Sequence, residues 1–186
     1  MKKFSLKLWC FVFFILIIDQ SLKLLIKINL DLGERIIITR WFHILFVENN
    51  GFAFGLEFFG GSGKLLLTCF RVVFVCLIFN WIVRFIAVNA NRWCVFALLL
   101  IFSGAIGNII DSVFYGVFFD YAPLGFGRVV DMFYFPIFSG TYPDWLPFFG
   151  GNSFVFFRFI FNIADSCITV GALLLIVLHK KVPLKY

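Results

Sequence analysis

The sequence predicts an all-α membrane protein with four transmembrane helices, a small extracytoplasmic sheet and an outer loop. The 186 residues are 62% hydrophobic and only 14% charged, with a mean hydropathy of +1.02. Soluble domains are roughly half apolar and about a quarter charged. Four apolar runs are long enough to cross the hydrocarbon core of a bilayer. The same composition excludes a disordered chain, because disorder needs low hydrophobicity and high charge.

The four predicted spans cover residues 8–28, 65–88, 93–114 and 154–178. The first follows Met1-Lys2-Lys3, which resembles the start of a signal peptide. Its apolar run is too long for a signal peptide, and no A-x-A cleavage site follows. We therefore expect an uncleaved first span, within a single membrane-embedded domain of residues 1–186.

The distribution of basic residues predicts the orientation of the spans. With the N-terminus inside, Lys2, Lys3, Lys7, Arg84, Arg92, Lys180, Lys181 and Lys185 face the cytoplasm and outnumber Arg35, Arg40 and Arg128 outside. The positive-inside rule then places both termini in the cytoplasm. The net charge of +6 is thus a topology signal, and we expect no nucleic-acid partner.

Two outer segments differ in character. Residues 34–58 are β-prone around Ile36–Thr39 and His43–Val47, and Asn49-Asn50-Gly51 is a turn signal. Residues 115–153 are rich in glycine, proline and aromatic residues, which is typical of a loop with interfacial anchors. We expect a small sheet from the first segment and an outer loop from the second.

No cofactor or metal is expected from the sequence. The five cysteines lie in apolar stretches without C-x-x-C spacing, and His43 and His179 lack the spacing of metal ligands. The cysteines are read as small hydrophobic residues.

Polar side chains interrupt three of the predicted spans, and ionisable groups inside a membrane are costly and often functional. Asp19 and Lys23 lie four residues apart and can pair on one helix face. Two further stripes share a face within the third and fourth spans: Gly104, Gly107, Asn108, Asp111 and Ser112, and then Arg158, Asn162, Asp165, Ser166 and Thr169. The predicted orientation puts all three stripes in the outer half of the bilayer, which predicts one polar cavity open to the extracytoplasmic side.

Asp165 has no cation four residues away and needs a partner or a proton. Two neighbouring carboxylates can share one proton and activate water without a cofactor. The second carboxylate would come from Asp111, Asp120, Asp131 or Asp144. Other interpretations are a small proton or ion translocator, or a membrane scaffold subunit whose glycines and asparagines only pack helices.

Five blocks of the sequence, in order, resemble the lipoprotein signal peptidase (signal peptidase II) family. The family patterns D-Q-x-x-K, N-x-G-A-A-F-G, G-A-x-G-N-x-x-D, G-x-V-V-D and F-N-x-A-D-S are matched at residues 19–23, 47–55, 104–111, 127–131 and 161–166. Phe52 replaces the first alanine of the second pattern. Any one block is weak evidence, but five in order along a four-span chain are specific.

The resemblance implies a membrane-embedded aspartic endopeptidase with four helices and an outer β-cradle. Such enzymes remove the signal peptide of diacylglyceryl-modified prolipoproteins before the lipidated cysteine, in the bacterial cytoplasmic membrane with the active site toward the extracytoplasmic side. It implies Asp131 and Asp165 as the catalytic pair, with binding or supporting roles for Asp19, Lys23, Asn49, Gly51, Gly104, Asn108, Asp111, Arg128, Asn162 and Ala164. The expected partners are lipid-modified prolipoproteins and membrane lipid, and we expect a monomer.

Two departures from the family pattern concern a missing arginine and the identity of the first catalytic aspartate. Ser112 stands where the family usually has an arginine, so we expect that cation either to be missing or to be supplied elsewhere, by Arg128 or Arg158. Asp120 lies at the spacing after Asp111 where many members place the first catalytic aspartate. We favour Asp131 because it follows Val129-Val130 and leads into an apolar run, whereas Asp120 begins a turn-like Asp-Tyr-Ala-Pro sequence.

Overall fold

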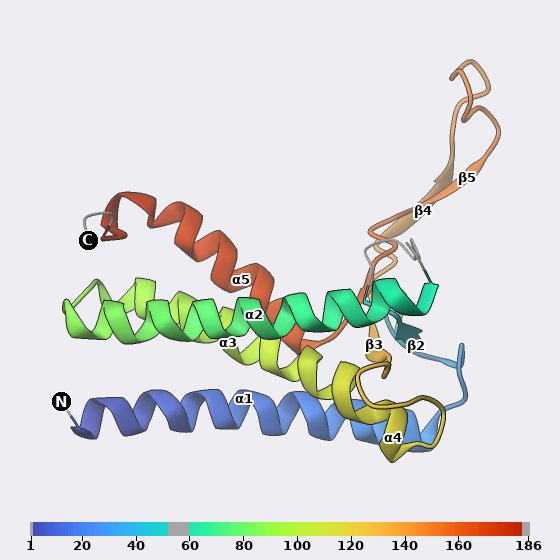
Figure 1. Ribbon diagram of the computed structural model, residues 1–186. Coiled ribbons are helices and arrows are strands. Elements are labelled where there is room, and N and C mark those ends of the chain that lie inside the picture. The colour runs from blue at the N-terminus through green and yellow to red at the C-terminus, as the bar shows by residue number, and fades with distance from the viewer. Residues whose placement is uncertain (1, 52–59, 184–186) are drawn as a thin grey trace.

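Three long apolar helices form the body of the protein in a computed structural model that describes residues 2–51 and 60–183 (Figure 1). They are α1 (Lys2–Asn29), α2 (Gly60–Ala87) and α3 (Arg92–Ile110), and α3 continues through a π-helical turn, η2 (Asp111–Tyr115), into α4 (Gly116–Phe118). Within these helices Leu6–Asn29, Ser62–Ala87 and Arg92–Phe118 are long and apolar enough to cross a membrane. A helix long and apolar enough to span is therefore present at each of the first three predicted spans, and their crossing of a membrane stays a prediction.

The fourth helix, α5 (Ile163–Val177), is shorter than predicted. Its 15 residues extend about 22 Å, less than the roughly 30 Å of the hydrocarbon core. The prediction of a span from residue 154 is wrong, because the helix begins only after Asn162. The Asn162 side chain accepts a hydrogen bond from the Asp165 N–H, and the Asp165 carboxylate accepts from the Asn162 N–H. This capping box fixes the start of α5.

The protein is not purely α-helical, as two antiparallel sheets lie at the end of the helices opposite both termini (Figure 1). The larger sheet has the strand order β1-β2-β3-β6. Its strands are β1 (Arg35–Thr39), β2 (Phe42–Asn49), β3 (Val129–Tyr134) and β6 (Ile160–Phe161). The β-prone prediction is confirmed for residues 35–49, whereas residues 52–58 lie outside the described part of the chain.

The second sheet is a two-stranded ribbon of β4 (Phe138–Thr141) and β5 (Ser153–Phe156). It projects from the end of the helices that carries the larger sheet (Figure 1). The predicted loop of residues 115–153 therefore contains β3, β4 and the start of β5. The apolar run at 154–161 forms strands because its phenylalanines and valine suit a pleated surface as well as a helix.

Helix α3 lies at the centre and packs closely against α5. A Cβ atom built on Gly104 would lie 2.2 Å from the Ala164 carbonyl oxygen, and one on Gly171 would lie 2.6 Å from the Ala97 carbonyl oxygen. No side chain fits at such distances, so glycine at these positions lets the two backbones touch. Gly104 thereby holds the first turn of α5 against the middle of α3.

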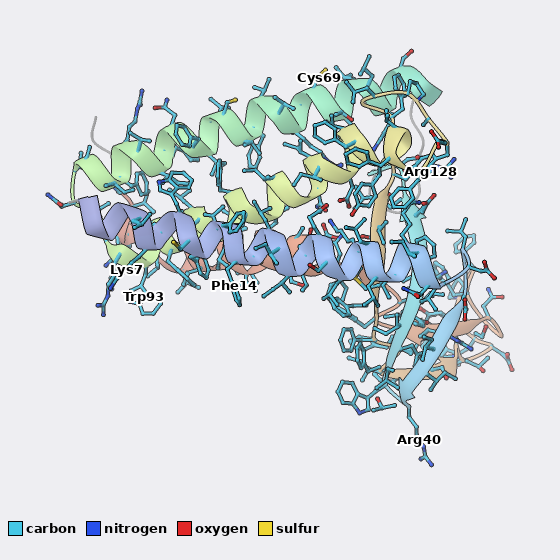
Figure 2. All side chains as sticks on the ribbon, turned by 90° about the horizontal axis from the view of Figure 1, so that it is seen from below. Lys7, Phe14, Arg40, Cys69, Trp93 and Arg128 are labelled. Atoms are coloured by element: carbon cyan, nitrogen blue, oxygen red, sulfur yellow. The ribbon has the colours of Figure 1, made fainter. Side chains whose placement is uncertain are left out.

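The two ends of the helical body carry different residues. Figure 2 shows Lys7 and Trp93 at the end far from the sheets, with Arg40 and Arg128 at the sheet end. Phe14 points away from the body and is 61% exposed. Such outward phenylalanines suit contact with lipid tails, and the orientation across the bilayer stays a prediction.

Candidate active site

Asp131 and Asp165 meet where strand β3 approaches the first turn of α5. Asp131 is 3% exposed and pairs with Val47 of β2 in the sheet register. Asn162 joins the two acids. Its Nδ2 donates to Asp131 Oδ1 at 2.7 Å, and its backbone N–H donates to Asp165 Oδ2 at 3.4 Å. One fully buried asparagine therefore holds both carboxylates.

Two further amides complete the hydrogen bonding of the acid pair. Asn108 of α3 donates from Nδ2 to Asp165 Oδ1 at 2.8 Å, and Asn49 at the end of β2 donates from Nδ2 to Asp131 Oδ2 at 3.2 Å. The Gly51 N–H in turn donates to Asn49 Oδ1 at 2.7 Å. Gly51 has φ +91°, a left-handed conformation that favours glycine. Neutral amides thus orient both carboxylates without neutralising them.

The environment changes the acidity of Asp131. Burial, followed by the negative charge of Asp165, raises the pKa of Asp131 to about 7. The hydrogen bonds from Asn49 and Asn162 and the charge of Lys23 act in the opposite direction. Since two close carboxylates do not both ionise cheaply, the pair can retain one proton near neutral pH.

A buried ion cluster on α1 supports this pair. Lys23 is 0% exposed and lies 2.9 Å from Asp19 Oδ2 and 2.8 Å from Asp111 Oδ2. Its Nζ also donates to Asn108 Oδ1 at 3.1 Å. The predicted pairing of Asp19 with Lys23 is confirmed, and Asp111 is the unpredicted third member.

The cluster binds backbone groups of the elements that carry the acid pair. Asp19 Oδ1 accepts the Ala164 N–H at 2.9 Å, and Asp111 Oδ2 accepts the Val130 N–H at 3.3 Å. Both donors are neighbours of the paired aspartates in sequence. The cluster therefore fixes the backbone of α5 and β3 beside the two carboxylates.

Gln20 and Tyr115 extend the network, although neither was assigned a role from the sequence. Gln20 Nε2 donates to Asp111 Oδ1 at 2.9 Å, and the Tyr115 hydroxyl donates to Gln20 Oε1 at 3.1 Å. Gln20 was visible as a polar residue within the first span. Nothing in the sequence distinguished Tyr115 from other aromatic residues.

The cation next to Ser112 comes from an unexpected helix. Arg128 lies against Glu48, with 3.2 Å between Nη1 and Oε2, and its side chain is 46% exposed. Arg158 is exposed in the turn between β5 and β6, outside the helix stripe to which it was assigned. Arg71 of α2 instead donates from Nη1 to Ser112 Oγ at 2.7 Å. The expectation that Arg128 or Arg158 supplies this cation is wrong.

Each of the other candidate acids lies in a different environment. Asp120 is exposed after α4 with φ +54°, which fits the turn predicted there. Asp144 is exposed in the turn of the β4–β5 ribbon, and Asp111 belongs to the ion cluster around Lys23. Of the four acids considered, Asp131 is the one held with Asp165 by a shared asparagine.

Comparisons with known proteins agree on one family. The family model described as "Signal peptidase (SPase) II" matches residues 11–180. A lipoprotein signal peptidase of Porphyromonas gingivalis is 41% identical, and the match covers 90% of this chain and 80% of that protein. One of Amoebophilus asiaticus is 37% identical, with coverage of 89% and 73%.

A solved structure has a similar fold. Its title describes a bacterial membrane enzyme studied by the in meso method at 2.3 Å resolution. The superposition has a TM-score of 0.65 at 28% sequence identity and covers 97% of this chain and 92% of that one.

Proposed function

This chain belongs to the signal peptidase II family, and on that premise we propose that it is an aspartic endopeptidase that cleaves diacylglyceryl-modified prolipoproteins before the lipidated cysteine. The family relation supports removal of prolipoprotein signal peptides by a multi-pass bacterial membrane protein. The observation that carries the aspartic mechanism is the pair of acids, Asp131 and Asp165, held by one buried asparagine. The other predicted site residues would position the acid pair or the substrate.

The acid pair would hydrolyse the peptide bond without a cofactor. Asp131 would carry the shared proton below about pH 7, because its pKa is raised to about 7. Asp165 takes a proton from water while Asp131 donates its proton to the scissile carbonyl oxygen, and the water oxygen bonds to the carbonyl carbon. Asp165 then gives its proton to the leaving nitrogen while Asp131 takes a proton from a hydroxyl of the tetrahedral intermediate, and the C–N bond breaks. The new carboxyl end and the new amine leave, and the pair keeps one proton.

The position of the pair suits a lipid-anchored substrate. Its residues come from the sheet end of the helices, opposite both termini (Figure 1). With both termini in the cytoplasm, as the basic residues predict, this end lies toward the extracytoplasmic side of the inner membrane. The diacylglyceryl tails of the substrate occupy the outer leaflet and place the bond before the cysteine at this depth.

A translocator is less well supported by the packing. Its polar groups would need to continue through the inner half of the helices. The described core of that half is a cluster of apolar residues that includes Val12, Ile78, Ile82 and Leu98. A scaffold, for its part, would need no pair of buried acids.

The proposed function is tested by cleavage of a synthetic precursor peptide with the purified protein in detergent micelles. Two peptides are compared, one with a diacylglyceryl-modified cysteine and one with the same sequence unmodified. Mass spectrometry should find cleavage immediately before the modified cysteine and little cleavage of the unmodified peptide. No cleavage, or cleavage at another bond, would contradict the proposal.

The pH dependence of cleavage is expected to follow Asp131. Its proton is needed for donation to the carbonyl, so kcat/KM should fall as pH rises through about 7. Asn49→Ala removes a hydrogen bond that favours the ionised carboxylate. Asp131 then keeps its proton to higher pH. The alkaline limb of the profile, where kcat/KM falls, should therefore move to higher pH.

The pH profile of each variant is measured with the lipidated peptide. Asn29→Ala, an exposed asparagine at the end of α1, is the matched control and should leave the limb in place. An alkaline limb that Asn49→Ala does not move would contradict the assignment.

The aromatic turn of the β4–β5 ribbon is proposed to clamp the substrate. Trp145, Phe148 and Phe149 are 76%, 97% and 56% exposed. Aromatic anchors commonly carry a large share of binding energy. Replacing all three with alanine should raise KM by about tenfold, which corresponds to about 1.4 kcal/mol, and should change kcat less. Trp93→Ala, at the opposite end of the helices (Figure 2), should leave KM unchanged, and equal KM values for the triple variant and the unaltered protein would refute the clamp.

A further inference from the structure

Helix α2 directs two basic side chains at the active site. Lys64, Thr68 and Arg71 are spaced four and three residues apart and share one helix face. Lys64 is 5% exposed, and its Nζ lies 3.4 Å from Ser112 Oγ. Arg71 Nη1 lies 2.7 Å from the same hydroxyl oxygen. Ser112 therefore accepts from two cations of a neighbouring helix.

Arg71 also connects to the acid pair through the turn after β2. Its Nη2 donates to the Gly51 carbonyl oxygen at 3.2 Å. The Gly51 N–H bonds to Asn49 Oδ1, and the Asn49 amide donates to Asp131. A Cβ atom on Gly51 would lie 2.6 Å from Arg71 Nη2. The guanidinium therefore fills the space beside Gly51 and determines where the Asn49 amide points.

The charges around the acid pair give Arg71 a second effect. Lys23 forms ion pairs with Asp19 and Asp111, and its charge also acts on Asp131. The Arg71 guanidinium interacts electrostatically with Asp165, Asp111 and Asp131. Arg71 thus brings a positive charge of α2 to the acid pair.

We infer that Arg71 is a positioning residue of the active site, which fixes the Gly51 turn that orients Asn49 and supplies positive charge to the Asp131–Asp165 pair. The inference rests on the proposed peptidase function. Arg71 acts on the substrate through the aspartates and Asn49, and Ser112 holds its guanidinium against α3. The arrangement assigns a site role to a helix that none of the recognised sequence blocks includes.

Removal of this charge should change how tightly the pair holds its proton. The other charged groups of the surrounding elements include Asp19, Lys23 and Lys27 of α1, Lys64 of α2, Asp111 of η2, Glu48 of β2 and Arg128 before β3. Without the guanidinium, the negative groups around Asp131 are less compensated. Asp131 then keeps its proton to higher pH, by about one pH unit for the loss of one nearby charge.

The test compares Arg71→Gln, Arg71→Lys and Arg84→Gln in cleavage of the lipidated peptide. Arg84 lies on the same helix and is exposed near its other end, so the same substitution there is the control. We expect Arg71→Gln to lower kcat at least about tenfold with a smaller change in KM, and to move the alkaline limb upward by about one pH unit. Arg71→Lys should restore the position of the limb and much of kcat, and Arg84→Gln should match the unaltered protein.

The outcomes separate the inference from the function on which it rests. If the unaltered protein and Arg84→Gln do not cleave the peptide, the proposed function fails. If they cleave and Arg71→Gln does so with the same kcat and pH profile, the inference fails. Where Arg71→Gln is inactive or does not fold, a folded and active Arg71→Lys with an unshifted limb supports the inference. A folded but inactive Arg71→Lys, or failure of both Arg71 variants to fold, overturns it.

Discussion

Asp131→Asn and Asp165→Asn are each expected to abolish cleavage of a lipidated precursor, with kcat reduced by about 10³-fold or more. Each substitution removes a proton donor or acceptor of the pair, and positioned acid–base groups contribute about 10²–10⁴-fold to catalysis. Asparagine has almost the same shape as aspartate. The amides of Asn162 and Asn108 therefore keep neighbours of similar size. The measurement is the single-turnover rate of cleavage by the purified variants.

Asp120→Asn is the matched control, because Asp120 is exposed in a turn with φ +54°. It should cleave at the rate of the unaltered protein. Loss of activity in Asp120→Asn together with an active Asp131→Asn would contradict the assignment of the first catalytic acid. Thermal unfolding of each variant in micelles shows that the inactive proteins are folded.

Lys23→Met is expected to destabilise the fold by about 3–5 kcal/mol, the usual cost of removing one partner of a buried ion pair. Lys23 is 0% exposed and bridges Asp19 and Asp111. Without it, two buried carboxylates lose the lysine that compensates them. These same carboxylates hold the Ala164 and Val130 N–H groups beside the acid pair. Activity should fall together with stability.

Lys7→Met provides the comparison on the same helix, since Lys7 is exposed at the opposite end (Figure 2). Exposed substitutions commonly change stability by less than about 0.5 kcal/mol. Unfolding by SDS titration in mixed micelles measures both variants. Adding Asp111→Asn to Lys23→Met should recover part of the loss, because one unpaired charge is removed. Equal stability of Lys23→Met and Lys7→Met would refute a stabilising role for the cluster.

The sequence alone was sufficient to predict those features whose physical signal is local. Hydropathy over about 20 residues identified the first three spans, because a helix in lipid must be apolar along its length. The spacing of Asp19 and Lys23 predicted their contact, since residues four apart are neighbours on a helix.

The start of the fourth helix was predicted wrongly because hydropathy, a local signal, does not distinguish a helix from a strand. The run at 154–161 is apolar enough for either a helix or a strand, and pairing of Phe161 and Ile160 with β3 decided in favour of a strand. The capping signal of Asn162 and Asp165 was present in the sequence and outweighed the hydropathy.

Arg71 shows what local signals leave open. Arg71 lies within the second predicted span, which began at residue 65 and so excluded Lys64, and neither residue was assigned a role from the sequence. Nothing local indicated that the guanidinium would reach both Ser112 and Gly51. The contact with Ser112 depends on the packing of α2 against α3. The contact with Gly51 depends on where the turn after β2 lies relative to α2.

By itself, the sequence determined that this is a multi-pass membrane protein of one recognisable family, and it indicated which polar residues lie within the apolar segments. Only the tertiary structure decided which of those residues meet: Asp131 with Asp165 through Asn162, Asp111 with Lys23, and Arg71 with Ser112. The reason is that hydropathy and helical periodicity act within one segment. The partner of a buried charge is set by the packing of segments far apart in the chain, where each charge must find compensation that water no longer provides.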